Sequence, residues 1–138
     1  MTPAPPPPAE GPTDPDLLDV DDLVQIAQGV VPGVLVRDAG LLASAAARPR
    51  TTVLGQDAYP TFAHKAAALL HSLVRNHCLI DGNKRLAWSA TRVLCLLNGV
   101  DIAYDVDEAE QLVLAAARGE LDVDALAASI AEHLVPAG

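Results

Sequence analysis

Aromatic residues are scarce in this chain of 138 residues, which contains one Trp, one Phe and two Tyr. Because 51% of the residues are nevertheless apolar, the core must be built mainly from Leu, Val and Ala. Ala and Leu favour helices, and runs of β-branched residues are short, so the composition predicts an all-α fold. The length is typical of a single domain.

Cysteine and long apolar runs are also limited. Cys78 and Cys95 are the only cysteines, and their spacing fits neither a zinc site, a redox motif nor a disulfide framework. No apolar run is long enough to cross a membrane, and the N-terminus lacks the basic-then-apolar pattern of a secretory signal. We therefore expect a soluble, cytoplasmic protein with reduced thiols.

Basic residues are outnumbered two to one, since nine Lys and Arg stand against 18 Asp and Glu, for a net charge of −9. This balance argues against nucleic acid or an anionic membrane as a partner. The window 61–92, however, holds five basic residues and one acid, a net of +4 that leaves −13 for the rest of the chain. A cationic centre suits a small polyanion such as a nucleotide, and chance clustering on a solvated face explains it equally well. The five basic residues are Lys65, Arg75, Lys84, Arg85 and Arg92.

Proline is concentrated at the N-terminus, where residues 1–15 contain seven of the eleven prolines. Such a stretch cannot form a helix interior and buries little surface. It predicts a disordered or polyproline tail. We therefore expect one domain that covers residues 16–138.

Helical periodicity, capping residues and breakers predict about six helices after the tail. Residues 50–60 have no helical period and favour an extended segment, which is either an ordinary connection or an edge on which an extended peptide docks. Gly99 suits the left-handed position that ends a helix, and a short extended piece follows it. The predicted helices cover 16–29, 38–48, 61–75, 85–97, Asp105 or Asp107 to Arg118, and Asp122 or Asp124 to Pro136.

The most informative stretch is Asn76–Arg85, a polar loop between the two apolar helices at 61–75 and 85–97. His77 is the only candidate general base in it, because imidazole exchanges a proton near neutral pH. Asp81 is a hard oxygen ligand that could hold Mg²⁺ beside substrate phosphates. Gly82 permits a tight turn with the backbone close to a ligand.

Asn83, Lys84 and Arg85 open the following helix, where free backbone N–H groups and the helix dipole favour an anion. Lys84 adds a point charge, and Arg85 adds a bidentate fork for phosphate oxygens. Each residue alone has an ordinary structural explanation, but together they supply the parts of a phosphoryl- or nucleotidyl-transfer site. No Walker loop, calcium loop or nucleophile elbow is present.

The segment His77–Arg85 reads His-Cys-Leu-Ile-Asp-Gly-Asn-Lys-Arg. It resembles the signature His-x-Phe-x-Asp/Ala-Gly/Ala-Asn-Lys-Arg of the Fic/Doc superfamily, and specifically its Doc (death-on-curing) branch, over roughly residues 17–134. The resemblance implies a Fic-like bundle of about six helices around a central helix–loop–helix, and a toxin of a toxin–antitoxin module. Fic enzymes proper have Gly where this chain has Lys84, and they transfer AMP to hydroxyls. Doc-type proteins instead act as kinases that move the γ-phosphate of ATP to a threonine of elongation factor Tu and halt translation.

By position, the resemblance makes His77 the base that activates the target hydroxyl and Asp81 the magnesium ligand. It implies two protein partners, elongation factor Tu and an antitoxin whose C-terminal segment occupies a groove of this chain. Leu79 replaces the motif Phe and Cys78 a common Pro, so we expect a looser loop with a thiol beside the base. An AMP transferase and an inactive Fic-fold binding module remain alternatives. The residues assigned to the ATP phosphates are Gly82, Asn83, Lys84 and Arg85.

Overall fold

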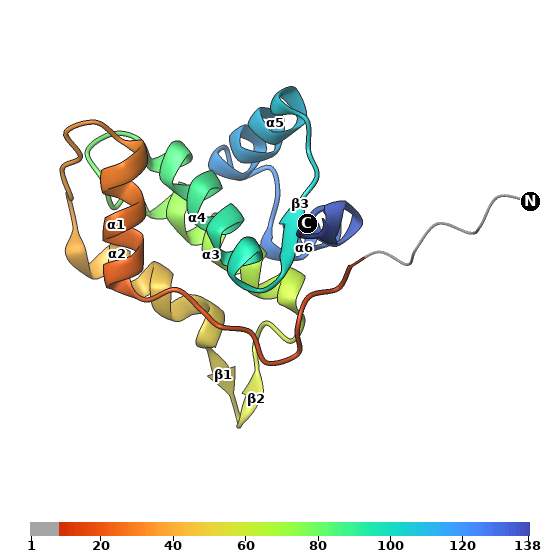
Figure 1. The fold of residues 1–138 in the computed structure, drawn as a ribbon. Coiled ribbons are helices and arrows are strands. Elements are labelled where there is room, and N and C mark those ends of the chain that lie inside the picture. The colour runs from red at the N-terminus through yellow and green to blue at the C-terminus, as the bar shows by residue number, and fades with distance from the viewer. Residues whose placement is uncertain (1–8) are drawn as a thin grey trace, which may run out of the picture.

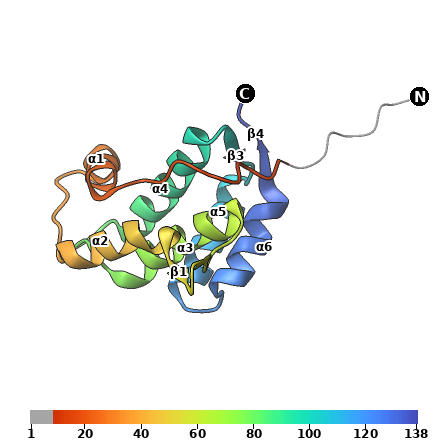
Figure 2. The same cartoon turned by 90° about the horizontal axis from the view of Figure 1, so that it is seen from below.

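The computed structural model describes residues 9–138 and is predominantly helical, which confirms the predicted all-α class (Figures 1 and 2). No helix in this part of the chain is both long and apolar enough to span a lipid bilayer. The α-helices are α1 (Val20–Val30), α2 (Ala39–Ala47), α3 (Phe62–Asn76), α4 (Asn83–Leu97), α5 (Val106–Ala117) and α6 (Val123–His133), and η1 (Arg48–Arg50) is a 3-10 helix. The short strands are β1 (Thr52–Val53), β2 (Gln56–Asp57), β3 (Val100–Ile102) and β4 (Leu134–Pro136).

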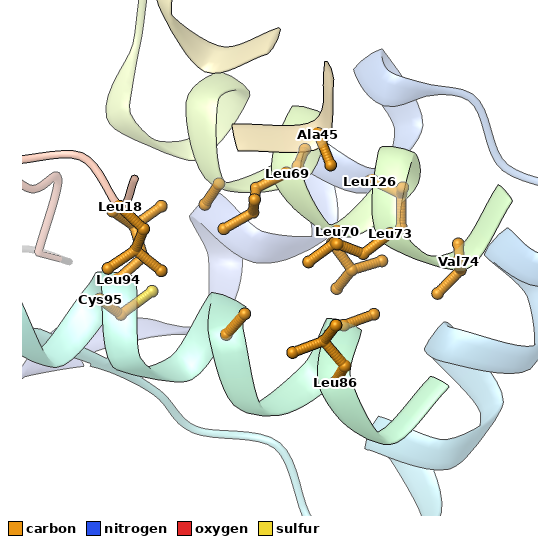
Figure 3. Packing of buried hydrophobic residues seen from close by; sticks show 14 of the residues in the cluster. Leu18, Ala45, Leu69, Leu70, Leu73, Val74, Leu86, Leu94, Cys95 and Leu126 are labelled. Atoms are coloured by element: carbon orange, nitrogen blue, oxygen red, sulfur yellow. The ribbon is translucent and has the colours of Figure 1, made fainter. Parts of the chain in front are cut away.

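Helices α3 and α4 form the centre of the molecule and pack against each other through leucine side chains (Figure 3). These leucines are at most 2% exposed, and burying each one contributes roughly 1.5–3 kcal/mol. The six-residue loop between the two helices is therefore held by two rigid elements. The leucines are Leu69, Leu70 and Leu73 of α3 and Leu86 and Leu94 of α4.

The outer helices flank this pair, with α1 and α2 on one side and α5 and α6 on the other (Figure 1). Strands β3 and β4 pair antiparallel, with Ile102 opposite Leu134. The predicted helix from Asp122 to Pro136 is therefore wrong in its last turn, because α6 ends at His133. Pro136 has no N–H to continue a helix, and β3 supplies the backbone partners instead.

Side-chain caps fix where most helices begin. Five of the six α-helices start after an Asp or Thr whose side chain accepts a hydrogen bond from a backbone N–H in the first turn. Helix α4 is the exception, because its N-cap is Gly82 and has no side-chain cap. Helix α1 begins at Val20 and not at residue 16, because Asp19 and Asp22 form a capping box there. The capping residues are Asp19, Asp38, Thr61, Asp105 and Asp122.

Part of the predicted N-terminal tail lies against the core. Residues 9–15 form no helix or strand, but Ala9 packs on the core, and a Cβ atom at Gly11 would lie 2.6 Å from the ring of Phe62. Residues 1–8 lie outside the described residues. The domain boundary at residue 16 stays a prediction.

The predicted extended segment at 50–60 contains the hairpin of β1 and β2, whose turn is made by Leu54 and Gly55. Lys65 of α3 is 6% exposed, and its ammonium donates to a carboxylate oxygen of Asp57 at 3.1 Å and to the carbonyl of Tyr59 at 2.5 Å. The hairpin is thereby attached to the N-terminal end of α3. A helix of 15 residues separates it from His77 by about 22 Å.

Candidate functional site

His77 ends helix α3 in a left-handed conformation, with φ 51° and ψ 49°. This conformation costs a residue other than glycine roughly 1–2 kcal/mol. Arg37 compensates for that cost, because its Nε donates to the His77 carbonyl at 2.6 Å and its Nη2 to the Asn76 carbonyl at 3.2 Å. A cation at the C-terminal end of a helix also interacts favourably with the helix dipole. The backbone of His77 is therefore held in place, while its imidazole is exposed to solvent.

The loop after His77 is paired with the segment that precedes α2. The backbone N–H groups of Arg37 and Asp38 both donate to the carbonyl of Cys78, at 2.8 and 3.1 Å. The N–H of Ile80 donates to the carbonyl of Leu35 at 3.0 Å. Two chain segments about 40 residues apart thus hold each other in place, which makes the loop a part of the scaffold.

Leu79 and Cys78, the two departures from the motif, both point into the core. Leu79 is 1% exposed and bridges to Val36, so it anchors the loop at the position where the motif has Phe. The expectation of a thiol beside the base is wrong, because Cys78 is fully buried. Burial also raises the pKa of the Cys78 thiol.

Asn83 braces the loop with its side chain. Its Oδ1 accepts from the N–H of Leu79 at 2.9 Å, and its Nδ2 donates to the carbonyl of the same residue at 3.0 Å. Each end of the amide is therefore held by Leu79, and one N–H of Nδ2 is left over. The predicted phosphate contact of Asn83 stays a prediction, and its backbone N–H at the open start of α4 is available for it.

The N-terminus of α4 is open. Gly82 has a φ of +86°, and a Cβ atom there would lie 2.6 Å from Cγ2 of Val31, so the position requires glycine. The first intrahelical bond runs from the N–H of Leu86 to the Gly82 carbonyl at 2.9 Å. In the described part of the chain, the N–H groups of residues 83–85 have no hydrogen-bond partner. They can bind an anion.

The two cations of the motif differ in how far they are already engaged. Lys84 is exposed and forms no ion pair with any residue from 9 to 138. Arg85 donates from Nη1 to the carbonyl of Val30 at 3.2 Å, which fixes the side chain against the end of α1. The remaining guanidinium N–H groups of Arg85 stay available for phosphate oxygens.

Asp81 is exposed, and its Oδ1 accepts from the N–H of Gly82 at 2.8 Å. Its second oxygen has no partner among the described residues. Residues 9–138 contain no group of three or more His, Cys, Asp and Glu that could enclose a metal. A single carboxylate beside an anion site fits Mg²⁺, which keeps several waters and binds substrate phosphates. The magnesium role of Asp81 stays a prediction.

All the predicted site residues line one open cleft of about 1060 Å³. The loop and the first turn of α4 form one wall, and α5 forms the other. The hairpin of residues 52–57 does not line this cleft. The possible role of this segment as a docking edge for an extended peptide stays a prediction. The predicted residues in the cleft are His77, Asp81, Gly82, Asn83, Lys84 and Arg85.

The α5 wall was not predicted from the sequence. Its side chains recur at positions 106, 110, 113 and 117, which is helical spacing, but no local signal shows that this face meets the loop. Trp88, one turn after Lys84 on α4, also lines the cleft. The unpredicted lining residues that carry charge are Glu110 and Arg118, and the main apolar ones are Val106, Ala109, Val113, Leu114 and Ala117.

Two comparisons with known proteins agree with this geometry. The model of the Fic/DOC family matches residues 17–95, which include both central helices and the loop. A curated relative, Toxin Doc from Mycolicibacterium smegmatis (strain ATCC 700084 / mc(2)155), is 49% identical over 119 residues, or 84% of this chain and 92% of that protein. The match covers most of both chains and more than half of this one lies within the family model. This chain therefore belongs to the Fic/DOC family.

Proposed function

We propose that this protein is the toxin of a toxin–antitoxin module and acts in the cytoplasm as a protein kinase. It transfers the γ-phosphate of ATP to a threonine of elongation factor Tu and thereby arrests translation. The observation that carries the proposal is the single cleft shared by His77, Asp81, Lys84 and the open N-terminus of α4. The name of the Mycolicibacterium relative, Toxin Doc, supports the toxin class.

In the proposed reaction, the imidazole of His77 accepts the proton of the target hydroxyl while the hydroxyl oxygen bonds to the γ-phosphorus of ATP. The bond from that phosphorus to the β–γ bridging oxygen breaks, and ADP leaves with the electron pair. The N–H groups of residues 83–85 and the ammonium of Lys84 stabilise the charge on the phosphoryl oxygens. Mg²⁺ held by Asp81 would neutralise further phosphate charge.

The proposed regulation is by a cognate antitoxin whose C-terminal segment occupies a groove of this chain. Neither nucleic acid nor membrane is a proposed partner, because the net charge of −9 repels both. Lys84 favours a kinase over an AMP transferase, since Fic enzymes proper have Gly at that motif position.

The test uses ATP labelled at either the α or the γ phosphate, with magnesium and either elongation factor Tu or bacterial lysate. Wild type, His77→Ala and His64→Ala are compared. His64 is the matched control because it lies in the first turn of α3, outside the cleft. Transfer of γ label that only His77→Ala abolishes supports the proposal. Transfer of α label would make the protein an AMP transferase, and transfer of neither label would favour an inactive binding module.

A further inference from the structure

We propose that α5 and Trp88 form the nucleoside half of the cleft and set the direction in which the nucleotide lies. Arg118 binds the phosphate chain from the wall opposite Lys84, Glu110 accepts hydrogen bonds from the ribose hydroxyls, and Trp88 packs against the base. The inference rests on the proposed nucleotide site, and all three residues lie outside the motif of residues 77–85.

Two contacts show which end of α5 lies near His77. The Nη1 of Arg75 donates to the carbonyl of Ala117 at 2.8 Å, so the C-terminal end of α5 is attached to α3 two residues before His77. At the other end, the rings of Trp88 and Tyr104 meet edge to face with centroids 5.7 Å apart, and Tyr104 immediately precedes the cap of α5. The cleft therefore runs from His77 at one end to Trp88 at the other.

The His77 end of the cleft is cationic on both walls. Arg118, the C-cap of α5, is exposed and lines the cleft. It forms no ion pair with the residues that the structure describes. Lys84 and Arg85 line the facing wall. Cations that face each other across a cleft are stabilised by an anion between them, even though the whole protein has a charge of −9. A triphosphate chain is an anion that both walls can bind at once.

The opposite end of the cleft is apolar and partly aromatic. Trp88 is half-buried, and Val106, Ala109 and Val113 of α5 line the same space. An indole ring and short aliphatic side chains leave room for a planar group, and stacking on an aromatic ring accepts any base. A nucleobase therefore fits here when the phosphates lie beside Lys84 and Arg118.

Glu110 lies between the two ends. It follows Val106 by one turn and precedes Arg118 by two turns, a rise of about 12 Å. Its carboxylate is exposed, lines the cleft and has no ion-pair partner among residues 9–138. The ribose of a nucleotide lies between phosphate and base, and acidic side chains accept hydrogen bonds from ribose hydroxyls in other nucleotide sites. If Glu110 binds the ribose in this way, the cleft prefers ribonucleotides to 2′-deoxyribonucleotides.

Trp88 is the only tryptophan of the chain, so its fluorescence reports directly on the base end of the cleft. The full chain carrying His77→Ala, which prevents turnover, is titrated with ATP, 2′-deoxy-ATP and tripolyphosphate in the presence of magnesium. Isothermal titration calorimetry measures the same affinities independently, and circular dichroism verifies that each variant is folded. We expect ATP to change the fluorescence and tripolyphosphate to compete with ATP.

The expected differences are about 10-fold in affinity, which corresponds to about 1.4 kcal/mol. 2′-Deoxy-ATP binds about 10-fold more weakly than ATP, and Glu110→Ala, which removes the acceptor oxygens, abolishes that ratio, whereas Glu132→Ala on α6 keeps it. Arg118→Gln weakens ATP and tripolyphosphate alike. Arg92→Gln, which removes an exposed arginine outside the cleft, weakens neither.

Three results would overturn the inference. Equal affinity for ATP and 2′-deoxy-ATP would show that Glu110 does not recognise the ribose. Calorimetric binding of ATP without a fluorescence change would show that the base does not pack against Trp88. Unchanged affinities in Arg118→Gln would remove the second phosphate contact. Each of these leaves the proposed kinase function intact. Failure of both ATP and tripolyphosphate to bind would overturn that function as well.

Discussion

The Nε atom of Arg37 lies 2.6 Å from the backbone carbonyl oxygen of His77, a residue 40 positions later in the chain. Arg37 also bonds the carbonyl of Asn76, so one side chain closes the end of α3 where the proposed base begins. The orientation of His77 therefore depends on a residue outside the motif, and on the packing of the segment before α2 against the loop.

Replacing Arg37 by Met keeps the aliphatic part of the side chain and removes both hydrogen bonds. We expect the transfer rate to fall by about 10- to 100-fold, because a small displacement of a catalytic group has a large effect on rate. Thermal unfolding should show a stability loss of only about 1 kcal/mol. The control is Arg50→Met, which removes an arginine that also donates to two backbone carbonyls, those of Leu18 and Ala46, neither of which lines the cleft. Full activity in Arg37→Met would contradict the positioning role.

Gly82 and Val31 are in contact across the start of α4. A methyl group at position 82 meets Cγ2 of Val31 at 2.6 Å in a left-handed backbone, so Gly82→Ala should destabilise the fold by about 1–3 kcal/mol. Val31→Ala removes the obstructing methyl groups, and the double variant should lose less than the sum of the single losses. Urea unfolding measures all three. Gly33→Ala is the control for the cost of a left-handed backbone without a steric clash. The φ of Gly33 is +63°, and nothing lies within 4 Å of a Cβ atom added there.

His71 makes the stability depend on pH. Arg48 donates from Nη1 to its Nδ1 at 2.8 Å, which requires a neutral ring. Burial and then the charges of Arg48 and Arg75 lower the pKa of His71, against an opposing effect of Asp122. Below about pH 6.5, the unfolded state therefore binds more protons at His71 than the folded state does. The contribution of the neutral His71 ring to the free energy of unfolding is fully present above that pH, and it is lost as the pH falls toward the lower pKa of the folded state.

Chemical denaturation between pH 7.5 and pH 5 measures this contribution. We expect the free energy of unfolding to decline on acidification and to decline less steeply in His71→Gln, which has no ionisable ring. An identical slope in the two proteins would show that the decline comes from other groups.

The two thiols should be unreactive in the native protein. Cys78 and Cys95 are fully buried, and burial raises the pKa of Cys95 to about 12. A colourless disulfide reagent that releases a chromophore should label neither thiol at pH 8 in buffer and both in concentrated guanidinium. Rapid native labelling that Cys78→Ala abolishes would show that the loop opens and would contradict the anchored loop described above.

Much of the fold follows from signals that act within four residues. Asp38 and Thr61 cap the helices predicted to begin there, and Gly99, with φ +80°, takes the left-handed position predicted at the end of α4. The prediction of a last helical turn near the C-terminus was wrong because Leu134 pairs with Ile102, 32 residues earlier. No local pattern encodes such a pairing.

The same limit applies to the site. The motif from His77 to Arg85 places its own residues in one cleft, because the loop and the helix start are contiguous in sequence. Arg37 and the α5 wall could not be predicted, since they reach the loop only through the packing of distant elements. The hydrogen bonds from the Asn83 side chain to Leu79 could not be predicted either, because they depend on the folded shape of the loop.

The hairpin of β1 and β2 stands at the far end of α3, about 22 Å from His77. Its tip residue Leu54 is 99% exposed, and the base of the hairpin is held by the buried ammonium of Lys65. An epitope or a fluorophore grafted at position 54 would thus be rigidly mounted and remote from the chemistry. The tip is a practical handle for immobilising the protein on a sensor surface with its cleft facing the solution.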